Sequence, residues 1–251
     1  MSKNVLIAGE SWMSYTTHVK GVDAFYTSVY EEGVSYLRKA IESIGYKVTF
    51  VPNHLAQNNL PFTAQEYAEY DAVILSDIGS NTLMLPSDTF TKSIPHPNRC
   101  MSIKEYVHEG GALIMIGGYL SFAGVDAKAR YNATPIQDVL PVICLDIDDR
   151  SEHAEGIRGK ILKEHPLTKD IEGEWPLLLG YNKTLPKSGC EVVADIDGDP
   201  LIAAGNFGKG CSAVFTSDCS PHWAPPDFVG WKHYVTIWKN MLEYLTKNKK
   251  Q

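Results

Sequence analysis

The sequence predicts an α/β fold, in which helices cover a mainly parallel sheet that gains antiparallel strands in the second half of the chain. In the first half, short apolar runs alternate with amphipathic stretches, as in strand–helix–strand units. In the second half, strand-like runs follow one another with little helix between them. No linker, repeat or low-complexity segment separates the halves, so we expect a single domain over residues 1–251.

Four apolar runs in the first half predict parallel strands. They are Val5–Ala8, Lys47–Val51, Asp71–Asp77 and Ala112–Ile116. The last run is the most apolar of the chain, as expected for a central strand that is covered on both faces.

Helices are expected between these strands. Near residues 30–44 the apolar side chains fall on one helical face, and Gly45 supplies a stop signal. Thr63–Glu66 and Ser102–Glu105 have the spacing of a capping box, so each should begin a helix. Gly110–Gly111 should end the second of these helices. The apolar face near residues 30–44 consists of Val34, Leu37, Ile41 and Ile44.

The second half should add strands and one closing helix. A hairpin turn is expected at Gly205–Gly210, between the last two strands. The expected strands are Ile143–Asp146, Gly156–Leu162, Glu191–Asp195, Leu201–Ala204 and Cys211–Ser217. The closing helix should bury an apolar stripe made of Trp231, Val235, Trp238, Leu242 and Leu245.

Composition excludes several classes of function. The net charge is −7, and the one dense basic run is the tail at 247–250, which argues against nucleic-acid binding. The five cysteines contain no C-x-x-C pair, so neither a disulfide framework nor a zinc knuckle is indicated. The apolar run after the N-terminus is too short for a signal peptide, and no 18-residue apolar stretch occurs. We therefore expect a cytoplasmic protein with no cofactor and no membrane contact.

Chemically rich side chains follow three predicted strands. The first strand leads into Gly9–Trp12 and on to His18, another into Ser76–Asn81, and a late one into Thr216–Trp223. Ligands of open α/β sheets bind beyond the carboxyl ends of the strands, so these loops should converge on one polar pocket with two tryptophan walls. The structural alternative is that these residues cap helices or cover the end of the sheet: Asp77, Asp218, Trp12 and Trp223.

A fourth strand exit has the pattern of a nucleophile elbow. Strand 112–116 runs into Gly117-Gly118-Tyr119-Leu120-Ser121-Phe122, and such an elbow turns sharply from a strand into a helix. Its nucleophile would occupy the third position, which is Tyr119. A phenol with a pKa of about 10 is a poor nucleophile for acyl transfer.

Together these four loops resemble the "putative glutamine amidotransferase" branch of the class I glutamine amidotransferase-like superfamily. The resemblance spans residues 4–246, and it implies a three-layer flavodoxin-like sandwich. His165-Pro166-Leu167 and Gly208-Lys209-Gly210 also resemble the related trehalose-utilisation-type proteins.

The resemblance does not extend to the glutaminase residues. Active members of the superfamily use an elbow cysteine together with a histidine and a glutamate two residues apart near the C-terminus. Here Tyr119 stands at the elbow, His222 fits the histidine, and Ala224 stands where the glutamate is needed. We therefore expect no glutaminase activity.

The first functional hypothesis is a protein that binds a small metabolite in a cleft at the carboxyl ends of the strands. The amides of Gly117 and Gly118 could hold an anion at the expected helix start. The candidate ligand-binding residues are Glu10, Trp12, His18, Asp77, Asn81, Gly117, Gly118, Tyr119, His222 and Trp223.

The second hypothesis is a hydrolase of another class. Ser121 could act as nucleophile with His222 as base and Asp218 or Glu10 as orienting group, although such a serine more often bonds its own backbone. Alternatively His18, His222 and a carboxylate could hold a metal ion that activates water, although no close histidine pair supports one.

Two further alternatives remain. Cys219 lies three residues before His222 and could act as a displaced nucleophile, although a small buried thiol is the ordinary interpretation. The third functional hypothesis is a non-catalytic interaction protein that forms homo-oligomers through its aromatic-rich ends.

Overall fold

The computed structural model describes residues 3–247, and its central element is a mixed eight-stranded sheet. Five neighbouring strands are parallel, and three antiparallel strands extend one edge, which confirms the predicted α/β class. The order across the sheet is β4 (Tyr46–Val51), β1 (Lys3–Gly9), β5 (Ala72–Ser76), β6 (Ala112–Ile116), β14 (Gly210–Phe215), β13 (Asp199–Phe207), β12 (Glu191–Ile196) and β9 (Lys160–Ile161).

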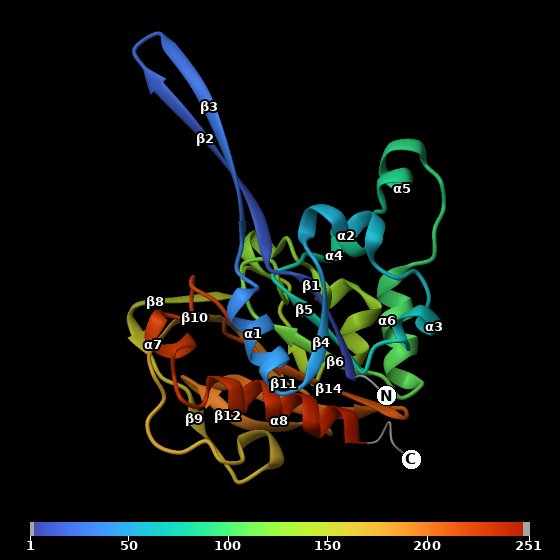
Figure 1. Ribbon diagram of the computed structural model, residues 1–251, viewed down its shortest axis with the longest axis vertical. Helices are drawn as coiled ribbons and strands as arrows, with labels where there is room; N and C mark the ends of the chain where they lie inside the picture. Colours follow the sequence, from blue (N-terminus) through green and yellow to red (C-terminus); the bar gives the residue numbers. More distant parts are fainter. Residues whose placement is uncertain (1–2, 248–251) are drawn as a thin grey trace.

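Helices cover both faces of this sheet (Figure 1). Alternate side chains of β1 point to opposite faces, so Val5 and Ile7 join one core cluster while Leu6 and Ala8 join the other. The first cluster lies under α1 (Ser35–Ser43), α7 (Pro226–Val229) and α8 (Tyr234–Thr246). The second lies under α2 (Asn53–Asn59), α3 (Ala64–Tyr67), α4 (Ser80–Met84) and α6 (Arg99–His108). The result is the expected three-layer sandwich.

Smaller elements surround the sandwich. α5 (Ser87–Lys92) lies in a segment that protrudes from the body in Figure 1. Two short antiparallel ribbons pair β8 (Arg150–Ile157) with β10 (Leu178–Asn182), and β7 (Val142–Cys144) with β11 (Thr184–Pro186). Short 3₁₀ turns occupy Val125–Ala127, Tyr131–Ala133, Pro135–Val139 and Pro166–Thr168. Within residues 3–247, no helix combines the length and the apolar character that crossing a bilayer would require.

A long hairpin, which we call the arm, projects from the body between β1 and α1 (Figure 1). It consists of β2 (Ser11–Lys20) and β3 (Asp23–Glu32), paired in register from Ser11–Glu32 to Lys20–Asp23. The prediction of a loop followed by a helix near 30–44 was therefore wrong at its start, since the helix begins at Ser35. The β-branched and aromatic residues that alternate through both segments favour strands.

Other predicted boundaries also shift. Thr63 and Glu66 do form a capping box on α3, as predicted. Ser102, in contrast, lies inside α6, which Asn98 caps through the Cys100 amide, and the Ser102 hydroxyl donates to the Phe62 carbonyl instead.

The predictions for the second half need several corrections. The hairpin turn of β13 and β14 is confined to residues 208–209, and β10 and β11 were not predicted. The predicted strand 156–162 is interrupted between β8 and β9. Trp231 precedes α8, and the half-exposed Val235 does not belong to the buried stripe of that helix.

The chain after β6 turns sharply but does not enter a helix. The Gly117 amide donates to the carbonyls of Phe215 and Ser217, so β6 and β14 stay in contact beyond their ends. A Cβ atom on Gly117 would lie 2.0 Å from the Thr216 carbonyl oxygen, which is backbone and cannot move aside. The expected glycine-dependent turn is present, whereas the expected helix is not.

We predict that Gly117→Ala destabilises the fold by about 3 kcal/mol or more, because the methyl group forces the two strand ends apart. Urea denaturation measures the change. Gly79→Ala is the matched control, since Gly79 also lies just after a strand and its Cβ would meet nothing closer than 3.8 Å. Equal stability of the two variants would contradict the close approach.

Candidate active site region at the strand ends

Acidic side chains gather where β1, β5 and β14 end. Glu10 follows β1, Asp77 follows β5, and Asp218 lies three residues beyond β14. Glu10 and Asp218 are each 1% exposed. Glu10 and Asp77 both have left-handed backbone conformations, with φ of 45° and 46°, an arrangement that is unfavourable for residues with a Cβ and recurs at functional sites.

The Glu10 carboxylate is held by two serine hydroxyls. Ser76 donates to Oε2 at 2.5 Å and Ser220 donates to Oε1 at 2.6 Å. The Ser220 amide in turn donates to Asp218 Oδ1 at 3.0 Å. The Cys219 sulfur lies 3.6 Å from the Ser76 hydroxyl, so the thiol belongs to the same buried cluster.

Burial controls the protonation of this cluster. It raises the pKa of Glu10, and the nearby Asp77 carboxylate raises it further. It raises the pKa of Asp218 well above its usual value, with Glu10 and Asp77 adding to the effect. It also raises the pKa of the Cys219 thiol, which leaves the nucleophilic thiolate form unfavourable.

Aromatic rings lie beside the acidic cluster. The His222 ring centre is 4.8 Å from that of Trp12 and 6.1 Å from that of Tyr119. Tyr119 also lies 5.6 Å from Trp223. We call these four residues the ring cluster. His222 connects the two groups, since its Nδ1 is 3.8 Å from Asp218 Oδ2.

Charged residues from β8 hold the ring cluster in place. Glu152 accepts hydrogen bonds from the Tyr119 hydroxyl and the Trp223 indole, both at 2.9 Å. The Arg150 guanidinium lies 5.0 Å from the centre of the Tyr119 ring. Burial, together with the Glu152 hydrogen bond, raises the pKa of Tyr119, so the phenol stays protonated at neutral pH.

A cavity of about 240 Å³ opens next to the ring cluster, between the base of the arm and α2. Trp12 belongs to both the cavity wall and the ring cluster. Asn53 fixes one side by donating to the carbonyls of Ser11 and Asp77, at 2.7 and 3.0 Å. The lining residues are Ser11, Trp12, Met13, Tyr30, Asn53 and His54.

The amides expected to hold an anion are already engaged within the chain. Gly117 donates to backbone carbonyls, and Gly118 donates to Asn182 Oδ1 at 2.9 Å. Asn182 in turn donates to Asp149, whose carboxylate also accepts the amides of Ala123 and Gly124. Burial raises the pKa of Asp149 to about 6. No helix starts at this turn, so the helix-start interpretation of the glycine pair was wrong.

The structure separates three other candidate residues from this region or engages them elsewhere. Ser121 donates to the Ile116 carbonyl at 2.6 Å and accepts the Asp77 amide. Asn81 is exposed on α4. His18 lies along the arm, stacked on Phe25, six residues and thus about 20 Å from Trp12.

His18 and His222 therefore lie too far apart to bind the same metal ion, as the metal hypothesis required. Within the described part of the chain, the potential ligand atoms that converge belong to Glu10, Asp218 and Cys219, within 4.8 Å of one another. Both Glu10 oxygens already accept serine hydroxyls, so the cluster is satisfied internally.

Sequence analysis missed the residues that support the site. Arg150 and Glu152 alternate on β8 and so share one face, which is the signal that could have identified them. Asn182 and Asp149 carried no comparable local signal, because the chain brings them together from separate elements.

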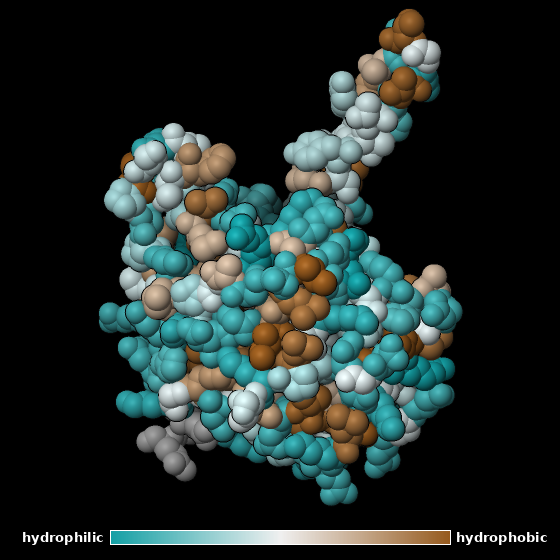
Figure 2. Space-filling view, turned by 180° about the vertical axis from the view of Figure 1, so that it is seen from behind, coloured by the Kyte–Doolittle hydropathy of each residue, from teal (hydrophilic) through white to brown (hydrophobic). Residues whose placement is uncertain are grey.

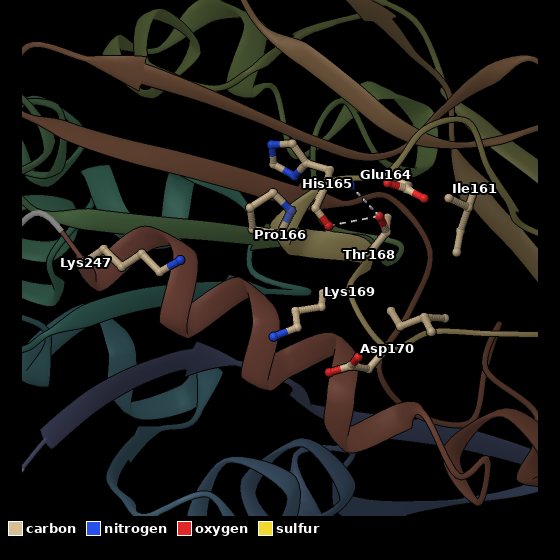
Figure 3. A pocket seen from close by; sticks show the side chains of 9 residues that line it. Ile161, Glu164, His165, Pro166, Thr168, Lys169, Asp170 and Lys247 are labelled. Carbon is tan, nitrogen blue, oxygen red and sulfur yellow. Dashed lines mark hydrogen bonds between the residues drawn. The ribbon is translucent and has the colours of Figure 1, made fainter.

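The His165-Pro166-Leu167 motif lies in a different place. His165 and Pro166 line a surface pocket of about 610 Å³ beside α8, where Lys169 and Lys247 also lie (Figure 3), whereas Leu167 is buried in the core. His165 Nδ1 accepts the Leu167 amide at 3.2 Å, and the Thr168 hydroxyl bonds the His165 backbone. The motif caps a 3₁₀ turn, which explains it structurally.

The three-layer sandwich with a tight glycine turn after β6 defines the class I glutamine amidotransferase-like fold. The family model described as "Putative glutamine amidotransferase" matches residues 4–247, and the chain belongs to this family. A comparison with curated protein sequences gave no significant match.

Solved structures support the assignment. Cytoplasmic protein STM1381 from Salmonella typhimurium LT2 shares 46% identity over 97% of this chain and 100% of its own, with a TM-score of 0.94. Cytoplasmic protein STM3548 from Salmonella typhimurium shares 43% identity over 96% and 98%, with a TM-score of 0.93. A ThuA-like protein from Bacteroides uniformis ATCC 8492 shares the fold alone, at 12% identity over 96% and 90%, with a TM-score of 0.56.

We predict that Asp218→Asn stabilises the protein at high pH. The raised pKa of Asp218 means that the folded chain holds this proton more tightly than the unfolded chain. Stability therefore falls as pH rises above the unfolded value of about 4. The asparagine does not titrate and keeps an oxygen for the Ser220 amide. Its gain in unfolding free energy should be on the order of 1 kcal/mol at pH 8 and should shrink towards pH 4.

Urea denaturation of both proteins across this pH range measures the difference. The exposed Asp227→Asn is the control, and it should follow the wild type throughout. A gain for Asp218→Asn that is independent of pH would contradict the burial argument.

Proposed function

We propose that this glutamine amidotransferase-like protein binds a small metabolite at the carboxyl ends of its strands and lacks the glutaminase triad of its superfamily. The observation that carries the proposal is the ring cluster beside a cavity of about 240 Å³. Tyr119 and His222 are exposed, Trp12 is partly buried and Trp223 is buried. Hydrogen bonds to Glu152 and the guanidinium of Arg150 hold these rings at the ends of parallel strands, which gives a preorganised surface for a ligand.

The cavity limits the size and chemistry of that ligand. Its volume is below the roughly 300 Å³ at which pockets for drug-sized molecules begin, so a monosaccharide or an amino acid fits better than a nucleotide. Aromatic walls favour a ligand with a flat apolar face. Arg150 and Glu152 supply charged groups of both signs at the rim of the ring cluster, which suits a polar molecule without large net charge.

The absence of glutaminase chemistry follows from the residues that occupy the triad positions. Tyr119 is a protonated phenol at the elbow, and Ala224 offers no carboxylate. Cys219, the displaced alternative, is fully buried with a raised thiol pKa. A cysteine nucleophile requires an accessible thiolate and an oriented base, so none of these residues replaces the missing set.

The hydrolase alternative receives less support. Asp218 does approach His222, but the Ser121 hydroxyl donates its proton to the Ile116 carbonyl. A serine nucleophile must instead donate to its histidine base. We therefore favour binding over hydrolysis.

The charge of the protein and the names of its relatives support a cellular location and a kind of partner. Both Salmonella relatives are named cytoplasmic proteins, and we assign this chain to the cytoplasm as well. Its net charge of −7 disfavours nucleic acid and anionic membranes as partners, because both are negatively charged. A small molecule is the partner that this charge allows.

We predict that a thermal-shift panel of monosaccharides, amino acids and nucleotides identifies a stabilising ligand in the first two classes. A ligand present at about 100 times its dissociation constant adds about 2.7 kcal/mol, which is several degrees in Tm. His222→Ala should abolish the shift, because it removes the ring packed against Trp12.

His96→Ala is the matched control. His96 is also exposed and also packs on an aromatic ring, that of Phe62 at 4.9 Å, but it lies outside the ring cluster. A panel without any stabilising compound, or a ligand whose effect survives in His222→Ala, would contradict the proposed site.

We also predict no release of ammonia from glutamine. The assay compares the wild type with Cys219→Ala, and both should remain at the rate of buffer alone. Hydrolysis lost in Cys219→Ala would make Cys219 the nucleophile, and hydrolysis that survives in the variant would reveal another one. Either result would contradict the assignment of an absent triad.

A further inference from the structure

The arm has two chemically different faces. Because side chains alternate along a strand, odd residues of β2 and even residues of β3 share one face. Between its ends this face carries no charged side chain, and we call it the uncharged face. It consists of Met13, Tyr15, Thr17, Val19, Ala24, Tyr26, Ser28 and Tyr30, all exposed.

The opposite face carries three of the four charged side chains of the arm, and the fourth, Glu32, lies at the base of the uncharged face. Lys20 and Asp23 stand near the tip, and Glu31 stands at the base, where it accepts the Trp12 indole. His18 and Phe25 stack between them. This face has its own internal partners. On the uncharged face, Tyr30 at the base packs against His54 and donates to Glu32, whereas Tyr15 and Tyr26 further out present their rings to solvent.

An arm of this kind gains little stability when nothing packs against it. A two-stranded hairpin is at best marginally stable in water without a further layer to pack against. Tyr15 and Tyr26 are each 78% exposed and Val19 is 69% exposed. Figure 2 shows brown and pale residues along the projecting arm, clear of the body. Contiguous exposed apolar surface of this kind indicates a binding surface.

Charge favours a second copy of the same chain as the occupant. Two copies that each carry −7 repel one another, so a contact between them is opposed least where the surface of the chain carries no charge. The uncharged face is such a surface. A nucleic acid or an anionic membrane would instead select lysine and arginine, and β2 and β3 contribute only Lys20.

Area indicates how the two copies meet. Ten residues span about 33 Å and two strands about 10 Å, so the uncharged face covers roughly 330 Å². Two arms packed on each other would bury only about 700 Å² in total. Two arms each lying on the body of the other copy would bury about 1,300 Å², within the range of stable complexes.

We propose that the protein is a homodimer in which the copies exchange arms, each uncharged face lying on the body of the partner. The contact is isologous, since each copy both gives and receives an arm. The base of the arm supplies Ser11, Trp12, Met13 and Tyr30 to the wall of the cavity described above. Docking of the arm therefore fixes one wall of that cavity, while the dimer itself does not require a ligand to be bound there.

Light scattering on the full chain during size exclusion tests the proposal. The wild type should have twice the 27.8 kDa mass of the chain. The double variant Tyr15→Glu/Tyr26→Glu should run as a monomer, because it places charge on the uncharged face. The matched control Thr16→Glu/Val29→Glu adds the same charge to the same strands on the opposite face, and it should remain dimeric.

A shortened arm keeps the test decisive if the charged variants misfold. Replacing residues 14–29 by Asn-Gly retains the base of the arm and should give a folded monomer, with far-UV circular dichroism as the check. A monomeric wild type would overturn the proposal, as would a dimer that survives arm shortening. A monomeric wild type that also sediments with phosphatidylcholine vesicles would assign the uncharged face to a membrane surface instead.

Discussion

The buried carboxylate of Glu10 joins the end of β1 to the end of β5 and to the loop after β14. It accepts Ser76 from the end of β5 and Ser220 from the loop after β14. The Glu10 carbonyl also accepts the amide of Gly33, where the chain returns from the arm. A Cβ on Gly33 would lie 2.4 Å from Glu10 Oε1, so the return path fits only glycine. The arm, the sheet and α1 thus meet at one carboxylate.

That arrangement supports the proposal that this chain lacks the glutaminase triad. The space at the strand ends holds three carboxyl groups and a thiol. Burial raises the pKa of all four groups, and neighbouring carboxylates raise the pKa values of Glu10, Asp218 and Cys219 further. A nucleophile with its base needs the opposite condition, an accessible and stabilised charge. The solvent-accessible functional groups lie outside this buried cluster. They are the ring cluster and the side chains of Arg150 and Glu152 on β8.

The sequence was sufficient to predict the layers and the strand ends. Short apolar runs identified four parallel strands and gave the fifth, β14, as a strand of the late hairpin, and the polar residues after them placed Glu10, Asp77 and Asp218 near one edge. Period-two alternation also runs through residues 11–32, yet the prediction there was a polar loop and the start of a helix, because both faces of the hairpin are exposed and no buried face marks the strands. Burial gave no signal there, since neither face of the arm belongs to the core.

Other parts of the site could not be predicted from the sequence, because they depend on contacts with residues far along the chain. The glycine pair after β6 predicted a tight turn correctly, but the helix that normally follows was replaced by bonds to Asn182 and Asp149. Those partners come from elements far along the chain, and no local spacing connects them to residue 118. The same holds for Glu152, whose role depends on two rings that the fold brings to it.

The register of the arm has an evolutionary consequence. Ser11 and Glu32 are paired at its base, so the chain leaves and re-enters the body at neighbouring points. Insertions or deletions made in pairs between these residues change the reach of the arm without displacing β1 or α1. Relatives with the same sheet and the same ring cluster can therefore diverge in arm length alone, so that the proposed contact between copies can change without altering the proposed ligand site.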